Sequence, residues 1–321
     1  MADSIKLNND FKGKDIISLN QFSPEDITTL FTHTNLMKNI AKNAQSSDIL
    51  KGNIITLIFY ESSSRTFGSF SAAMKQLGGQ TVEIQNPQEF SSVSKGETLE
   101  DTIRVFEAYS DAIVIRHPQI GTALKAADAA SFVPIINAGD GIGEHPTQAL
   151  LDLYTIYEKY QRLGNLTVVF AGDILNGRTI HSLLKGLSLY KNNKIYLLSP
   201  KELRLDPHEL SKFIKQGLYI MEIETEKEIP KNADIWYWTR VQKERFASLK
   251  DYDKVKNRYI VTKDFLKKYA GKETMLMHPL PRVGEIHREV DTDERAVYLS
   301  TEIRNGMYIR MALLGLILGK L

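Results

Sequence analysis

Short apolar runs alternate with helix-like segments along almost the whole chain. Seven of these runs are predicted strands, at residues 53–61, 111–116, 133–137, 166–172, 194–199, 233–239 and 274–278. Most of them are continuously apolar, which is typical of strands that helices cover on both faces of a parallel sheet. The pattern therefore predicts an α/β fold with a mostly parallel sheet.

Two predicted helices indicate how the chain divides. Pro146 fits the first turn of a long helix, and a last helix is expected over about residues 299–318. The length of 321 residues is about twice that of a typical domain. We therefore expect two domains, each a mostly parallel sheet flanked by helices, joined by two connecting helices. The first domain would comprise residues 1–148, with the C-terminal helix 300–321 packing back on it, and the second would comprise residues 149–299.

Composition and charge narrow the class of protein. The chain is 42% hydrophobic and 25% charged, and its 41 Lys plus Arg against 39 Asp plus Glu give a formal net charge of +2. These fractions are ordinary for a globular protein, and the charge lacks the basic excess of a nucleic-acid binder. The chain has no cysteine, which excludes disulfides, thiolate nucleophiles and cysteine-ligated zinc.

Neither end of the chain reads as a targeting or membrane segment. The stretch MADSIKLNNDFKGKDI lacks the apolar core of a signal peptide and carries acidic residues, so the expected location is the cytoplasm. The apolar run from Met311 to Leu321 is far shorter than the ~20 residues that cross a bilayer. We interpret it as a buried helix end and expect no membrane or nucleic-acid partner.

Polar and mostly cationic motifs follow the predicted strands. They are SSSRT (62–66), RHP (116–118), AGDGIGEHPTQ (138–148), GDILNGRT (172–179), TRVQKER (239–245) and HPLPR (278–282). Ligands of open α/β sheets bind outside the carboxyl ends of the strands. The set of motifs therefore predicts one cleft lined by cations.

The motif SSSRT leaves two interpretations open. It leads from a predicted strand into a predicted helix, where free N–H groups attract an anion and Arg65 could hold a phosphate at two points. A serine that caps the helix, beside a surface arginine, is an equally ordinary interpretation.

The glycine-rich segment before Pro146 does not fit a nucleotide site. Gly139, Gly141 and Gly143 have the wrong spacing for a dinucleotide fingerprint, so tight turns that present His145 are the better interpretation.

The histidines and hydroxyl groups limit the chemistry. Taken singly, His117, His145, His181 and His278 are each more typical of a hydrogen-bonded structural histidine than of a catalytic one. No histidine pair has metalloprotease spacing, and no Gly-x-Ser-x-Gly motif occurs. We expect a site without metal or cofactor that stabilises a small polyanion and its transition state electrostatically.

Several motifs occur together in one known family. In order, they are SSRT, KGETLEDT, RHP, INAGDGIGEHPTQALLDLYTI, GDILNGRTIHSL, TRVQKERF, HPLPRVGEI and NGMYIRMALL. From about Phe11 to Leu318 the chain resembles the aspartate carbamoyltransferases of pyrimidine biosynthesis, within the aspartate/ornithine carbamoyltransferase superfamily. The resemblance implies a carbamoyl-phosphate domain, an aspartate domain, and active sites between them that are shared in a homotrimer. A regulatory subunit or a carbamoyl phosphate synthase would be candidate partners.

The resemblance also implies roles for individual residues. The phosphate group would contact Ser63, Ser64, Arg65 and Thr66, with Ser91 and Lys95 on a mobile loop that reaches a neighbouring subunit's site. The carbamoyl group would contact Arg116, His145 and Gln148. Aspartate would contact Lys95, Arg178, Arg240 and Gln242, and the backbone of Pro279 and Leu280.

The implied reaction needs no covalent intermediate. The amine of aspartate would attack the carbonyl carbon of carbamoyl phosphate while Thr66, Arg116 and His145 polarise its oxygen. Arg65 and Lys95 would meet the charge of the departing phosphate, which could itself take the proton.

Four residues depart from the family's pattern. Ser64 stands where many members have threonine, and Phe67, which we interpret as a packing residue, stands where some have arginine. Leu175 and Asn176 replace a lysine and an aromatic residue or histidine, which leaves open how this loop meets aspartate.

Two alternative functions remain. Ornithine carbamoyltransferases share the phosphate loop but typically carry a cysteine in the motif that here reads HPLPR, and this chain has none. A non-catalytic scaffold would have no need of buried cations, which cost desolvation energy. Transfer to aspartate is therefore the favoured hypothesis.

Overall fold

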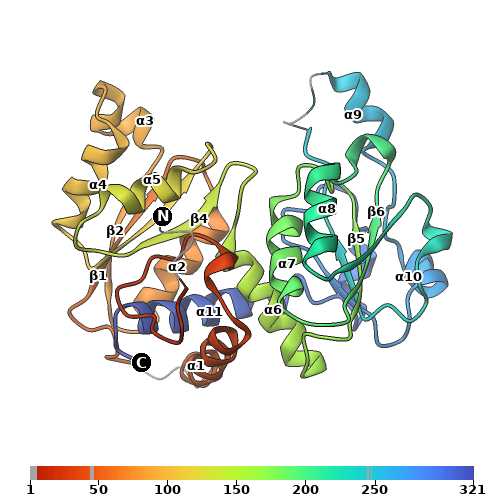
Figure 1. Ribbon diagram of the computed structural model, residues 1–321, viewed down its shortest axis with the longest axis horizontal. Coiled ribbons are helices and arrows are strands. Elements are labelled where there is room, and N and C mark those ends of the chain that lie inside the picture. Colours follow the sequence, from red (N-terminus) through yellow and green to blue (C-terminus); the bar gives the residue numbers. More distant parts are fainter. Residues whose placement is uncertain (1–5, 44–46, 244–245, 247) are drawn as a thin grey trace. The chain divides into compact units, whose positions relative to one another are not determined.

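The computed structural model describes residues 6–43, 47–243, 246 and 248–321. The chain folds into two compact units: unit 1 comprises Met1–Tyr154 and Arg304–Leu321, and unit 2 comprises Thr155–Ile303. It passes from unit 1 to unit 2 within helix α6 (Pro146–Tyr160) and returns within helix α11 (Thr301–Ile317) (Figure 1). Each unit holds a parallel sheet flanked by helices, so the predicted fold class is confirmed.

Unit 1 is built on a four-stranded parallel sheet in the order β2-β1-β3-β4. The strands are β1 (Ile54–Phe59), β2 (Gln80–Gln85), β3 (Ala112–His117) and β4 (Ile135–Asp140). The helices are α1 (Pro24–Lys42), α2 (Ser64–Gln76), α3 (Pro87–Phe90), α4 (Leu99–Glu107) and α5 (Thr122–Ala129), with 3-10 turns η2 (Leu19–Gln21) and η3 (Ser92–Lys95). On one face of the sheet, Ile103 of α4 and Ala126 of α5 pack with Ile113 of β3.

Helix α2 covers the other face of this sheet. The ring of Phe59 meets the ring of Phe67 there, with 5.2 Å between centroids. Phe67 is 8% exposed, so its interpretation as a packing residue is confirmed.

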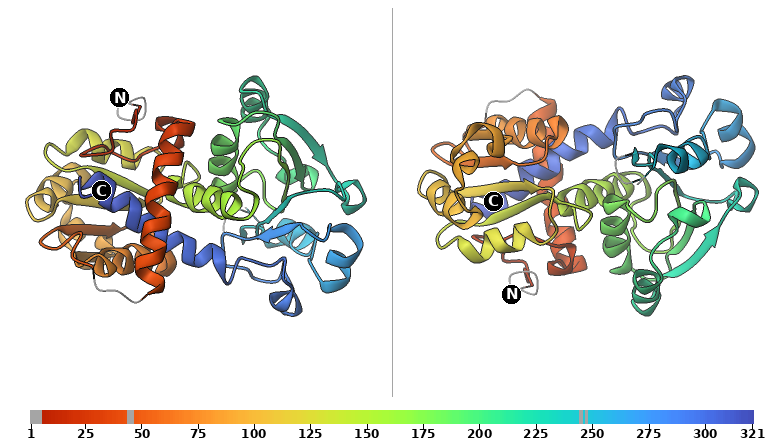
Figure 2. Two further views of the ribbon diagram at one scale, coloured as in Figure 1. Left: turned by 90° about the horizontal axis from the view of Figure 1, so that it is seen from below. Right: turned by 90° about the horizontal axis from the view of Figure 1, so that it is seen from above.

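The C-terminal helix α11 packs within unit 1. The backbone N–H of Gly13 donates to the carbonyl of Ile317 over 2.9 Å, and Figures 1 and 2 show α11 between α1 and the sheet. Leu313 and Leu314 are fully buried, which confirms the predicted buried helix end. Within the described ranges, no helix is long and apolar enough to cross a membrane.

Unit 2 is built on a five-stranded parallel sheet in the order β7-β6-β5-β8-β9. The strands are β5 (Thr167–Ala171), β6 (Lys194–Leu198), β7 (Tyr219–Ile223), β8 (Ile235–Trp238) and β9 (Met275–Met277). The helices are α7 (Arg178–Ser188), α8 (Pro207–Lys215), α9 (Leu249–Val255) and α10 (Lys263–Tyr269), with 3-10 turns η4 (Lys201–Leu203), η5 (Glu226–Glu228) and η7 (Arg288–Thr292). In the core, Trp236 and Trp238 pack with Leu266 of α10 and Leu276 of β9.

Two strands, β2 and β7, were not predicted from the sequence. Both lie at an edge of their sheet. In β7, Tyr219 is 56% exposed and Met221 is 36% exposed, whereas Ile223 is buried. The exposed residues of β7 are themselves apolar, but Glu222 interrupts its short apolar run, and Gln80, Glu83 and Gln85 interrupt that of β2, so a search for continuous apolar runs misses both strands.

Candidate active site

The predicted motifs of unit 1 follow strands that are neighbours in the sheet. Strands β1, β3 and β4 are adjacent and parallel, so their carboxyl ends meet at one edge. Arg116 is the penultimate residue of β3, and the segments after β1 and β4 carry Ser63 to Thr66 and His145, respectively. The topology therefore brings three of the six predicted motifs together.

The start of α2 favours the anion-binding interpretation of SSSRT. Ser63 occupies the N-cap position, yet in the described part of the chain its side chain makes no cap hydrogen bond. Ser62 is also engaged elsewhere, because its hydroxyl donates to Asn86 Oδ1 over 3.0 Å. Ser64 and Arg65 are exposed at the first turn. The interpretation of a serine-capped helix is therefore wrong, and the N–H groups at the start of α2 receive no capping side chain from Ser63.

Three side chains suited to polarising a carbonyl group lie at these strand ends. Thr66 Oγ1 is 3.5 Å from His145 Nε2, and both residues are buried. Arg116 is 7% exposed. Its Nη2 lies 2.7 Å from Glu61 Oε2, and its Nη1 donates to the carbonyl of Ala138 over 3.1 Å. The ion pair with Glu61 fixes a permanently charged donor beside the start of α2.

The loop between β4 and α6 is a tight turn that presents His145. Gly141 has φ +53°, and a Cβ there would lie 2.6 Å from the carbonyl of Pro118. Asp140 closes the turn, because Oδ1 accepts from the N–H of Glu144 over 2.9 Å and Oδ2 accepts from that of Gly121 over 2.8 Å. The interpretation of this segment as turns that present His145 is confirmed.

Gln148 is oriented by a buried carboxylate. Its Nε2 donates to Asp152 Oδ1 over 3.0 Å. Asp152 is fully buried, and an ionised carboxylate can only accept. The amide nitrogen of Gln148 is therefore the atom that faces Asp152, and the amide oxygen is the other end of the group.

Ser91 and Lys95 lie on the segment formed by α3 and η3. The Ser91 hydroxyl donates to the carbonyl of Pro87 over 2.7 Å and accepts from the N–H of Val93 over 3.2 Å. Lys95 ends η3 with an exposed side chain. These contacts stay within the segment, and the reach of Lys95 into a neighbouring site stays a prediction.

The aspartate-binding candidates of unit 2 also follow adjacent strands. Strands β5, β8 and β9 are neighbours and parallel. Arg178 is the first residue of α7, Arg240 and Gln242 follow β8, and Pro279 and Leu280 follow β9. The topology therefore brings this second set to one edge of the sheet. The end of the motif TRVQKER, Glu244 and Arg245, lies outside the described residues.

Asn176, one of the departures from the family's pattern, joins two of these segments. Its carbonyl accepts from the N–H of Arg178 over 3.0 Å and from Gln242 Nε2 over 2.8 Å. Its side-chain amide donates to Asp173 Oδ1 over 3.0 Å, and Asp173 Oδ2 accepts from the N–H of Gln242 over 3.2 Å. Leu175 is 38% exposed. Burial raises the pKa of Asp173, and these hydrogen bonds act in the opposite direction.

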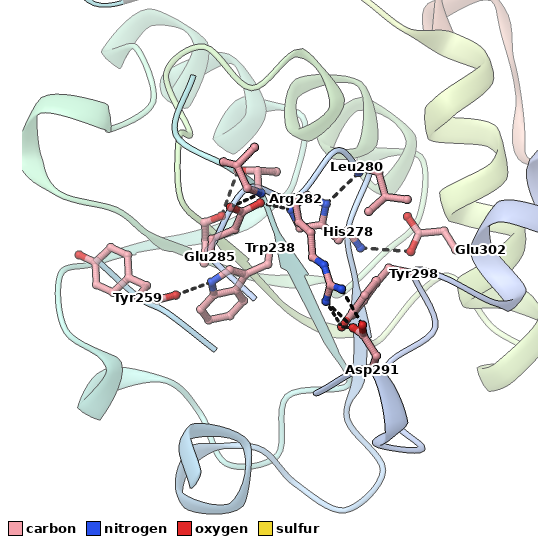
Figure 3. Close-up of polar contacts among 12 residues, drawn as sticks. Trp238, Tyr259, His278, Leu280, Arg282, Glu285, Asp291, Tyr298 and Glu302 are labelled. Atoms are coloured by element: carbon pink, nitrogen blue, oxygen red, sulfur yellow. Dashed lines mark hydrogen bonds and ion pairs between the residues drawn. The ribbon is translucent and has the colours of Figure 1, made fainter. Parts of the chain in front are cut away.

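Three of the four histidines make structural hydrogen bonds. His181 Nε2 donates to the carbonyl of Ile174 over 2.8 Å, and burial lowers the pKa of His181. His117 Nδ1 accepts from the N–H of Gln119 over 3.0 Å. His278 Nε2 donates to Glu285 Oε1 over 2.7 Å (Figure 3). The structural interpretation is confirmed for these three residues.

The sequence did not single out the acidic residues that hold the site in place. Glu61, Asp152 and Asp173 pair with Arg116, Gln148 and Asn176, respectively. Of these, only Asp152 stands at a spacing, four residues after Gln148 on one helix, that signals contact. The described residues include no group of three or more His, Cys, Asp or Glu that could hold a metal ion.

Two ion pairs after β9 make unit 2 sensitive to acid. The hydrogen bond from Arg282 lowers the pKa of Asp291, and that from Arg295 lowers the pKa of Asp293. Figure 3 shows the Arg282 guanidinium beside Asp291 and Tyr298. A carboxyl with a folded-state pKa below its unfolded value stabilises the protein above the unfolded pKa. That stability is lost as the pH falls through the folded-state pKa.

We expect the unfolding free energy of unit 2 to fall gradually as the pH drops below about 6.5, where His181 is protonated in the unfolded chain before it is in the folded one, and to fall more steeply below about pH 4. The chain's two tryptophans, Trp236 and Trp238, both lie in unit 2, so their fluorescence in urea titrations reports on that unit. Asp291→Asn should flatten the fall between pH 4 and 3 and lower stability at pH 6. Equal acid slopes in the variant and the parent would contradict this account.

The class of protein is defined by two parallel-sheet α/β units, each with polar and cationic side chains gathered at adjacent strand ends. Residues 14–158 match the carbamoyl-phosphate-binding domain of aspartate/ornithine carbamoyltransferase, and residues 164–317 match the Asp/Orn-binding domain. The chain therefore belongs to the aspartate/ornithine carbamoyltransferase family.

Individual relatives resemble the chain over nearly its full length. It is 45% identical over 309 residues to the chloroplastic aspartate carbamoyltransferase of Arabidopsis thaliana, covering 96% of this chain and 78% of that protein. It is 43% identical to the aspartate carbamoyltransferase catalytic subunit of Methanobrevibacter smithii, covering 95% and 94%. The crystal structure of aspartate transcarbamoylase from Trypanosoma cruzi, in complex with carbamoyl aspartate and phosphate, has a TM-score of 0.89 and 39% identity, covering 96% and 97%.

Proposed function

We propose that this chain transfers the carbamoyl group of carbamoyl phosphate to the amino group of L-aspartate, giving N-carbamoyl-L-aspartate and phosphate for pyrimidine biosynthesis. The observation that carries the proposal is the convergence of Thr66, Arg116 and His145 at the strand ends of unit 1, beside the start of α2. The T. cruzi relative, crystallised with carbamoyl aspartate and phosphate, supports the same reaction.

Carbamoyl phosphate would bind to residues of unit 1. The phosphate would lie at the start of α2, held by its N–H groups with Ser63, Ser64, Arg65 and Thr66. Donors from Thr66, Arg116 and His145 would stabilise the negative charge that develops on the carbonyl oxygen. Gln148 would accept from the carbamoyl NH₂ group through its amide oxygen, since its amide nitrogen donates to Asp152.

Aspartate would bind to residues of unit 2. Arg178 and Arg240 would bind the two carboxylates, with Gln242 and the backbone of Pro279 and Leu280 orienting the amine. The amine forms a bond to the carbonyl carbon, the bond from that carbon to the phosphate oxygen breaks, and the departing phosphate takes the amine's proton. Holding the two substrates in the correct relative orientation supplies much of the rate acceleration of carbamoyl transfer. No general base from the protein is required.

Assembly and location form part of the same proposal. The carbamoyl-phosphate domain would be residues 1–148 with helix 300–321, and the aspartate domain residues 149–299. We propose a cytoplasmic homotrimer in which Ser91 and Lys95 serve a neighbour's site. A regulatory subunit is a candidate partner, since the M. smithii relative is named a catalytic subunit. A carbamoyl phosphate synthase is the other candidate.

Product formation by the purified protein tests the reaction. Carbamoyl phosphate with aspartate should give carbamoylaspartate and an equal amount of phosphate, and ornithine should give no product above the uncatalysed rate. Turnover with ornithine alone, or with neither amine, would contradict the proposal.

Mixing two inactive variants tests the shared site. Arg65→Ala and Lys95→Ala should each be nearly inactive, and mixed oligomers should regain part of the activity because some sites combine intact halves. Light scattering and mass spectrometry of the mixture verify that chains have exchanged. Verified mixed oligomers without regained activity would mean that each chain holds a complete site.

A further inference from the structure

The segment after β9 holds a non-glycine residue in a left-handed backbone conformation. Leu280 has φ +56°. This conformation costs free energy for residues with a Cβ, and it persists where surrounding contacts over-determine it. The side chain of Leu280 packs against the hydrophobic core of unit 2. The backbone N–H of Leu280 is held by His278, since it donates to His278 Nδ1 over 2.8 Å.

The hydrogen bond from Leu280 fixes the protonation of His278. A backbone N–H can only donate, so Nδ1 is the acceptor and the ring proton is on Nε2. Nε2 donates to Glu285 Oε1 over 2.7 Å. Figure 3 shows the ring between Leu280 and Glu285. His278 is 1% exposed and Glu285 is 6% exposed, so water does not compete for these contacts.

Glu285 also holds the far end of the same loop. Its Oε2 accepts from the N–H of Val283 over 3.0 Å. The other end is held at the His278 N–H, which donates to Glu302 Oε2 over 3.1 Å. The carboxylate of Glu285 and the imidazole of His278 therefore connect both ends of the loop to Leu280.

We propose that His278 and Glu285 are positioning residues that hold Leu280 in its left-handed conformation and so aim the backbone of Pro279 and Leu280 at the reacting substrates. This inference rests on the proposed function, which gives those backbone groups their ligands. The pair itself does not touch substrate.

Two substitutions at His278 separate positioning from general structural support. His278→Ala removes the acceptor for Leu280 and should lower kcat/KM for carbamoyl transfer about tenfold, the effect of one hydrogen bond of ordinary net strength. His278→Asn restores an acceptor two residues before the N–H of Leu280, as in an Asx turn, and should recover more than half of the loss. Inhibition by inorganic phosphate, which would bind at the start of α2, should be unchanged in both variants.

The chain offers a matched control in an exposed histidine–glutamate pair. His287 Nδ1 lies 3.4 Å from Glu289 Oε1, with side chains 62% and 41% exposed. His287→Ala should leave kcat/KM and phosphate inhibition as they are in the parent. Glu285→Gln should resemble His278→Ala, since an amide cannot satisfy both His278 and Val283.

The proposal is overturned if His278→Ala stays within twofold of the parent, if His278→Asn is no better than His278→Ala, or if phosphate inhibition weakens in step with turnover. A parent protein without carbamoyl transfer would instead contradict the proposed function. The hydrogen exchange of the Leu280 amide then still tests whether His278 and Glu285 hold Leu280 in its conformation. Exchange should be about tenfold faster in His278→Ala than in the parent, and equal rates would overturn the inference.

Discussion

Replacing Arg116 by leucine is expected to lower kcat for carbamoyl transfer by about 100- to 1000-fold, the usual loss when a donor to a developing oxyanion is removed. Arg116 lies at the end of β3, and the ion pair with Glu61 holds its guanidinium in place. The KM for aspartate should change much less, because the lost interaction strengthens only as charge moves onto the carbonyl oxygen.

The same substitution at an exposed arginine is the control for Arg116→Leu. The side chain of Arg104 on α4 is 64% exposed, so Arg104→Leu should keep the parent's kcat. Arg116→Lys should stay well below the parent, since an ammonium lacks the fork of the guanidinium. Free guanidinium at millimolar concentration should restore part of the activity of Arg116→Ala. Full activity in Arg116→Leu would remove Arg116 from the proposed mechanism.

Replacing Arg310 by leucine is expected to destabilise unit 1 by about 2–3 kcal/mol, because the buried guanidinium makes a charge-assisted hydrogen bond and attracts the carboxylate of Asp152. Arg310 on α11 is 3% exposed, and its Nη1 donates to Ser69 Oγ over 3.0 Å. Burial lowers the pKa of Arg310 to about 10, and attraction to Asp152 acts in the opposite direction. Removal of the guanidinium leaves the buried Asp152 carboxylate without that attraction.

A second substitution shows whether charge or packing carries this loss. Asp152→Asn removes the carboxylate charge and keeps an oxygen that can accept from Gln148, so Arg310→Leu with Asp152→Asn should regain at least half of the lost stability. Denaturation followed by circular dichroism reports both units, and tryptophan fluorescence reports unit 2. The Arg310 guanidinium also lies over the ring of Phe70, with Cζ 5.1 Å from the ring centroid. A double variant no more stable than Arg310→Leu would assign the loss of stability to this packing contact.

The central strands could be predicted from the sequence, and the edge strands could not. Helices bury both faces of strands such as β5 and β8, and their continuous apolar runs follow from that burial. Strand β2 is an edge strand with no buried residue. Its polar alternation is therefore weak as a sequence signal.

The cations of the candidate site could be predicted, and most of their partners could not. Arg116 lies at the carboxyl end of a strand, and Arg65 and His145 follow strands, so topology alone places all three at one edge of the sheet. Some contacts that orient the site join residues far apart in the sequence, such as Glu61 with Arg116, and Asp173 with Gln242, which are 69 residues apart. Such pairs depend on the register of neighbouring strands, which local patterns do not encode.

By the proposed function, the chain transfers a carbamoyl group to aspartate in preference to other amines. Carbamoyl phosphate labelled with ¹³C at the carbonyl carbon, added to purified protein with equal concentrations of aspartate and ornithine, tests it in one NMR measurement. We expect the label to appear in carbamoylaspartate, with one phosphate released per product. Label in carbamoylated ornithine, or only in the products of spontaneous breakdown, would contradict it.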